Sequence, residues 1–192
     1  MTRATTGQRK GVSAVVGKGR GDIHVCSLDR VWTTVERERP SHLITLLHND
    51  AILATPSAIE SGRHLRISMH DISVPQAGMV HPSATHVQRI LAFVALWDRE
   101  APLVVHCLAG ISRSTATAFI AACALNPHVA ETVIAGRIRE LSPTASPNLL
   151  LVELADGLLG REGRMIEAVE AIGYGEPAME GWPFALPSEW PA

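Results

Sequence analysis

Short apolar runs alternate with segments of helical periodicity along most of this chain. Runs of five or six mostly apolar residues are typical of strands, whereas apolar residues three and four apart are typical of helices. Because strands alternating with helices form a largely parallel sheet, the pattern predicts an α/β fold with helices flanking a central sheet. The expected strands are residues 23–28, 42–47, 64–69 and 103–107. The expected helices are residues 29–38, 82–97, 126–141, 148–160 and 163–173.

Two of these helices carry a further expectation. Asn126 and Pro127 are a good cap and first turn, so they predict the start of the helix that runs to Leu141. Residues 148–160 are apolar almost all round, which predicts a helix buried on every side.

The length and composition indicate one globular domain. The chain has 192 residues, of which 46% are hydrophobic and 19% charged, enough for a sizeable core. Residues 1–21 carry basic side chains and no acidic one, so we expect a flexible basic tail, with a targeting peptide as the alternative. Glycines 17, 19 and 21 resemble a dinucleotide loop, but a strand follows them where such a loop needs a helix. Residues 22–175 are the expected domain, and the proline-rich, apolar residues 176–192 are expected to pack on it as a C-terminal tail.

The totals also exclude several classes of function. A net charge of −2 gives no indication of nucleic-acid binding. The sequence has no apolar run of membrane-spanning length and no signal-peptide core, so we expect a cytoplasmic protein without membrane insertion. Its three cysteines lack the spacing of a disulfide framework or a zinc site, and its nine histidines lack a metal-ligand pattern. We therefore expect a monomer that needs no metal or other cofactor.

The stretch LVVHCLAGISRS, residues 103–114, predicts a site for an anion. A strand ends at Cys107, a loop with Gly110 in it reaches Arg113, and a helix follows. Such a loop presents backbone N–H groups beside a helix N-terminus, and Arg113 adds a planar fork for two phosphate oxygens. A thiol in that environment ionises readily and becomes a nucleophile. A buried core cysteine would not explain the glycine and the arginine, although it is the better interpretation of Cys26 and Cys123.

The residues His106-Cys107-x-x-Gly110-x-x-Arg113-Ser114 resemble the signature HCxxGxxR[S/T] of the cysteine-based protein tyrosine phosphatases, in wording closest to the dual-specificity branch. The resemblance extends more loosely over residues 22–160, where Pro147-Asn148 matches a pair that opens a late helix in that branch. It implies a phosphatase-like, three-layer α/β fold. The implied roles are a nucleophile at Cys107, a phosphate clamp at Arg113, a hydrogen bond to sulfur from Ser114, an ordering role for His106, and a phosphate cradle formed by the amides of Leu108, Ala109, Gly110, Ile111, Ser112 and Arg113.

A general acid is needed to protonate the leaving group, and the aspartates offer two candidates. Asp71 follows the strand 64–69 and Asp50 follows the strand 42–47, so both lie at the edge where Cys107 lies. Asp98 precedes the strand of Cys107 and lies at the wrong end. The resemblance favours Asp71, which stands in MHDI where tyrosine-specific relatives have Trp-Pro-Asp; a turn residue or a helix cap is the alternative role.

The variable loop positions bear on the substrate. None of Leu108, Ala109, Ile111 and Ser112 is charged, whereas phosphoinositide members of the superfamily often carry charges there. The resemblance therefore implies a phosphotyrosine phosphatase, with phosphoserine and phosphothreonine as further substrates, acting on a phosphorylated protein or a small phosphomonoester. A lipid or inositol phosphate phosphatase and a silent phosphate-binding module are the alternatives, and Arg137 and Arg139 form a potential basic rim.

Overall fold

The computed structural model describes residues 21–48 and 53–191, and its centre is a five-stranded sheet. The strand order is β3-β2-β4-β1-β5, and the first four strands run parallel while β5 pairs antiparallel with β1. The strands are β1 (Ile23–Ser27), β2 (His42–Leu47), β3 (His64–Ser68), β4 (Leu103–Cys107) and β5 (Phe184–Leu186). The predicted mostly parallel α/β sheet is confirmed, and the basic tail predicted over residues 1–21 lies almost entirely outside the described residues.

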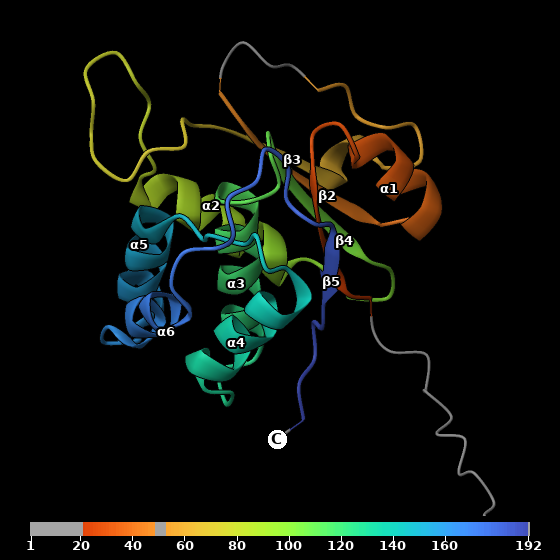
Figure 1. Cartoon of the computed structure of the whole chain (residues 1–192). Helices are drawn as coiled ribbons and strands as arrows, with labels where there is room; N and C mark the ends of the chain where they lie inside the picture. Colours follow the sequence, from red (N-terminus) through yellow and green to blue (C-terminus); the bar gives the residue numbers. More distant parts are fainter. Residues whose placement is uncertain (1–20, 49–52, 192) are drawn as a thin grey trace, which may run out of the picture.

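Helices cover both faces of this sheet and complete three layers (Figure 1). One helix lies on one face and five lie on the other, where a large apolar core joins them to the sheet. The helices are α1 (Val31–Glu38), α2 (Ala84–Ala95), α3 (Arg113–Leu125), α4 (Glu131–Leu141), α5 (Leu149–Leu159) and α6 (Arg164–Ile172). Among the described residues, the structure contains no helix long and apolar enough to cross a membrane.

Helix α3 is the central helix of the larger layer, and its first eleven residues are therefore all buried. It follows β4, which lies between β2 and β1 in the middle of the sheet. The turn after Cys107 therefore connects a central strand to a buried helix, and both elements fix its position.

Two helix predictions are wrong in detail. Asn126 ends α3 and does not begin α4: its side-chain amide donates to the carbonyl oxygens of Ala122 and Ser188, and α4 begins only at Glu131. Helix α5 is not buried all round, because Leu149 and Leu158 are partly exposed while Leu151 and Val152 face the core. The apolar residues of this helix thus extend beyond the side that packs against α2, α3 and α6.

The C-terminal segment lies against the sheet and reaches back to α3. Phe184 and Leu186 are buried, and β5 extends the sheet beside β1. The backbone amide of Trp190 donates to the Asn126 side chain at 3.1 Å. Trp182, in contrast, is mostly exposed.

Candidate active site

The loop from Cys107 to Arg113 turns sharply at the carboxyl end of β4. Gly110 has φ +74°, a conformation that side chains disfavour, and a Cβ there would lie 2.8 Å from the carbonyl carbon of Cys26. Both facts explain why this position needs glycine.

Gly110→Ala is expected to lower the melting temperature by about 5–10 °C, because strain at positive φ adds to a clash with the backbone of β1. Gly157→Ala is the matched control, since Gly157 lies in α5 with open space around it and should gain about 0.5–1 kcal/mol. Thermal unfolding of both variants checks the prediction, and equal stability of the two would contradict it.

Neighbouring elements hold four carbonyl groups of the loop. Backbone amides of the neighbouring elements donate to these four carbonyl oxygens. The backbone amides of residues 108–113, in contrast, donate no loop or turn hydrogen bond to another backbone group of the described chain. Backbone amides without an acceptor in such a turn can bind an anion. The pairs are Leu28 to Leu108 at 3.0 Å, Gly181 to Ala109 at 2.8 Å, Ser146 to Ile111 at 2.9 Å and Asn148 to Ser112 at 3.3 Å.

The Cys107 thiol lies at the bottom of this loop, at the N-terminus of α3. The residue is 1% exposed, and its Sγ is 3.2 Å from the hydroxyl oxygen of Ser114. This contact allows a hydrogen bond between the hydroxyl and the sulfur, and the helix N-terminus adds a partial positive charge beside it.

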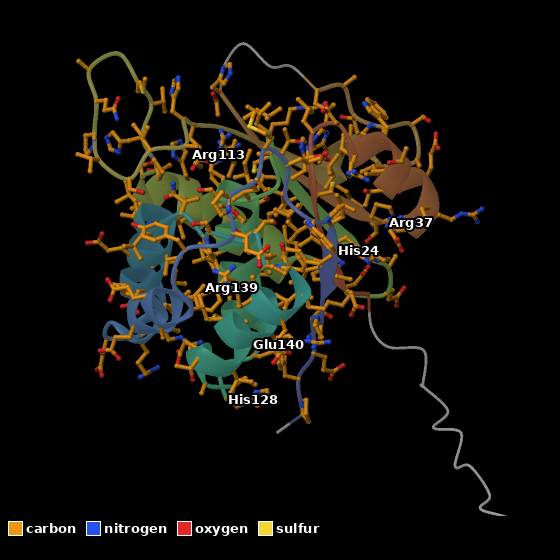
Figure 2. All side chains as sticks on the ribbon, in the orientation of Figure 1. His24, Arg37, Arg113, His128, Arg139 and Glu140 are labelled. Atoms are coloured by element: carbon orange, nitrogen blue, oxygen red, sulfur yellow. The ribbon has the colours of Figure 1, made fainter. Side chains whose placement is uncertain are left out.

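Arg113 carries a buried guanidinium that protein groups satisfy only in part. One terminal nitrogen donates to the carbonyl oxygen of Met69 at 2.8 Å, whereas Nε has no hydrogen-bond partner among the described residues. Nε lies 3.6 Å from a carboxylate oxygen of Asp71. Figure 2 shows Arg113 near the carboxyl ends of the strands. A buried cationic N–H without a hydrogen bond indicates that an anionic ligand can bind there.

Asp71 lies on the loop that follows β3, and two side chains hold its carboxylate over the Cys107 loop. The Ser112 hydroxyl donates to Oδ1 at 2.7 Å, and the Asn148 amide donates to the same oxygen at 2.9 Å. Asn148 is also the N-cap of α5, where its oxygen accepts from the Leu151 amide, so Pro147-Asn148 opens this helix as predicted. Asp50, the other candidate acid, lies outside the described residues.

His106 is fully buried beneath the loop, and burial lowers its pKa to about 4. Its ring contacts the Cys107 carbonyl oxygen and the hydroxyl of Thr45. The other two cysteines belong to the core. Burial raises the pKa of Cys26 to about 11 and raises that of Cys123 further, so neither is a reactive thiol.

The C-terminal segment contacts the loop and the residues at the end of β1, and no pattern in the sequence predicts these contacts. Besides the Gly181 amide on Ala109, the Glu180 carboxylate accepts from the Ser27 hydroxyl at 2.6 Å and from Arg30 Nε at 2.7 Å. These hydrogen bonds lower the pKa of Glu180. Residues some 150 positions apart thus meet behind the loop.

A cavity of about 440 Å³ opens beside the loop, next to Asp71. Its lining includes Ile111, Ser112, Asn148 and Tyr174. In the described part of the chain, no three histidine, cysteine or acidic side chains gather as a metal site would require.

Comparisons with known proteins give structural likeness at low sequence identity. No protein-family model matches the sequence, and no curated protein matches it. The structure of DUSP15 matches with a TM-score of 0.57 and 18% identity, over 83% of this chain and all of that chain. The structure of the PTP-2 phosphatase of Cydia pomonella matches with a TM-score of 0.55 and 17% identity, over 71% of this chain and 84% of that chain. The structure of human DUSP28 matches with a TM-score of 0.54 and 16% identity, over 73% of this chain and 89% of that chain. The likeness confirms the predicted fold.

Proposed function

We propose that this chain, which has the fold of the dual-specificity phosphatases, hydrolyses phosphomonoesters through a cysteinyl-phosphate intermediate. The observation that carries the proposal is the buried Arg113 guanidinium, whose Nε has no hydrogen-bond partner among the described residues, in a loop that begins at Cys107 and whose amides donate to no backbone group described. Fold alone would not justify an activity, because one fold serves many functions.

In the first step the Cys107 thiolate attacks phosphorus, and the bond from phosphorus to the leaving oxygen breaks. Asp71 gives its proton to that oxygen. The amides of residues 108–113 and the Arg113 guanidinium bind the phosphoryl oxygens and stabilise their charge in the transition state.

In the second step a water molecule attacks the phosphorus of the intermediate and gives a proton to Asp71. The sulfur–phosphorus bond breaks, and the electron pair returns to Cys107. The Ser114 hydroxyl, 3.2 Å from Sγ, stabilises the departing thiolate by a hydrogen bond. Inorganic phosphate leaves, so both steps balance without a metal or another cofactor.

Phosphotyrosine is the substrate we propose, with phosphoserine and phosphothreonine as further substrates. The exposed Leu108 and the half-buried Ile111 give the loop an apolar rim that suits an aromatic ring. We place the protein in the cytoplasm as a monomer, because Cys107 must stay reduced and no part of the proposed site calls for a second chain.

Asp71→Asn is expected to lower kcat by about 10²–10⁴-fold on substrates with poor leaving groups, because the amide has no proton to give. The loss should shrink for aryl phosphates whose leaving group needs no protonation. A series of aryl phosphates of graded leaving-group pKa measures this difference. Asp98→Asn is the control, since Asp98 lies before β4 at the far end of the strand. An equal loss across the series would remove Asp71 from the role of acid.

Hydrolysis of a phosphotyrosine peptide by the wild-type protein in EDTA tests the proposed function itself. Turnover in EDTA together with inhibition by vanadate is the expected result. A protein that binds vanadate but turns over no phosphomonoester would be a binding module. Preference for a phosphoinositide over every phosphopeptide would reject the proposed substrate class.

A further inference from the structure

A line of polar side chains crosses the face of the sheet that α1 covers and ends at the candidate nucleophile. Thr45 on β2 is the register partner of His106 on β4 and of Arg66 on β3. His64 lies two residues before Arg66 and is buried, as are Thr45 and His106. Such groups are costly inside a core unless each is hydrogen-bonded.

Each of these groups has a partner. Thr45 Oγ1 lies 2.8 Å from Nε2 of His106 and 2.8 Å from Nε2 of His64. His64 Nδ1 lies 3.1 Å from Thr55 Oγ1, and that hydroxyl accepts from Arg66 at 2.6 Å. At the other end, His106 Nδ1 lies 3.4 Å from the carbonyl oxygen of Cys107.

The hydrogen positions along this line follow from what each atom can donate. A neutral imidazole has one N–H and one lone pair, and a carbonyl oxygen only accepts. His106 Nδ1 therefore carries the hydrogen that points to Cys107, and its Nε2 accepts from the Thr45 hydroxyl.

The same reasoning fixes the remaining hydrogens. The Thr45 hydroxyl has given its one hydrogen to His106, so it accepts from His64 Nε2–H. His64 Nδ1 then accepts from the Thr55 hydroxyl, which in turn accepts from Arg66. Every hydrogen of the line thus points from Arg66 toward Cys107.

We propose that Thr45 and His64 are positioning residues that hold His106 with its hydrogen on Nδ1, directed at the Cys107 carbonyl, so that the aligned bond dipoles stabilise the Cys107 thiolate. The dipoles add because each has its positive end toward Cys107, and a hydrogen-bonded chain polarises its members further. The inference deepens the proposed function and rests on it only for the catalytic use of that thiolate.

The positive charges near His106 and His64 favour the neutral form of both imidazole rings. Arg113 faces His106, and Arg66 and His106 face His64. Burial is the main cause that lowers the pKa of each ring to about 4, the nearby guanidiniums of Arg113 and Arg66 lower it too, and the hydrogen bond to the Cys107 carbonyl opposes the shift at His106. Both rings are neutral near neutral pH, as the ordered line requires.

Alkylation of Cys107 by iodoacetamide as a function of pH tests the proposal without requiring activity. In Thr45→Val we expect the midpoint of the pH profile to rise by about one unit and the rate, measured at a pH below both midpoints, to fall about tenfold. Thr45→Ser keeps the hydroxyl and should restore the wild-type profile. Peptide mass spectrometry follows the alkylation of Cys107 separately from that of Cys26 and Cys123. Equal profiles of the wild-type protein and folded Thr45→Val would overturn the proposal.

Nitrogen-15 NMR of the histidine side chains adds a test on the unaltered protein, which serves if Thr45→Val fails to fold. We expect His106 to carry its hydrogen on Nδ1 and His64 to carry it on Nε2. The opposite tautomer at either ring would overturn the proposal. These results are separable from the proposed function: a protein with the expected tautomers and alkylation profiles that hydrolyses no phosphomonoester would refute the activity and leave the positioning role intact.

Discussion

Cys107→Ser is expected to lower phosphatase activity by at least about 10⁴-fold, the largest effect of any single substitution in this protein. A serine hydroxyl stays protonated at neutral pH and is a much weaker nucleophile than a thiolate. The free amides and the buried Arg113 would remain, so the variant should still bind the anion.

Initial rates on an aryl phosphate, together with vanadate or phosphate binding measured by calorimetry, check both parts of this expectation. Cys123→Ala is the control, because Cys123 is buried in α3 away from the loop and should keep its activity. Retention of more than about 1% of the activity by Cys107→Ser would contradict the nucleophilic role.

Arg113→Lys is expected to reduce kcat about 10³-fold, the second largest effect. The guanidinium combines a hydrogen bond to Met69 with an Nε–H that has no hydrogen-bond partner among the described residues, and its planar fork can bind two oxygens at once. An ammonium group has a different geometry and cannot keep both interactions. A charge-conserving substitution therefore separates the geometry of the fork from its charge.

The measurement is kcat, KM and the inhibition constant of inorganic phosphate, with thermal unfolding to show that the variant is folded. Arg137→Lys serves as the control, since Arg137 lies exposed on α4 and pairs only with Glu140 among its described neighbours. A loss of less than about tenfold in kcat for Arg113→Lys would mean that charge alone binds the phosphate.

Local patterns in the sequence were enough to predict the sheet and the loop. The strand that ends at Cys107 and the turn at Gly110 are set by neighbours in the chain, and the structure has both. The prediction for Asn126 is wrong because an asparagine can cap either helix end. It lies between α3 and α4, and its amide contacts Ser188 in a segment that no local pattern connects with it.

The supports of the site depend on contacts between distant residues, and the sequence did not reveal them. Asn148 holds Asp71 across 77 positions, and Glu180 meets Ser27 across 153. Thr45 and His64 looked like ordinary strand residues, because a buried polar line shows only once β2, β3 and β4 are placed side by side. Topology, rather than spacing, determines these contacts.

Trapping the phosphorylated enzyme tests the central claim most directly. The protein is mixed with a ³²P-labelled phosphotyrosine peptide, quenched in acid within milliseconds, digested and mapped by mass spectrometry. We expect label on Cys107 alone, released at the rate of turnover and absent from Cys107→Ser. Turnover without label on Cys107, or label on another residue, would contradict the cysteinyl-phosphate mechanism.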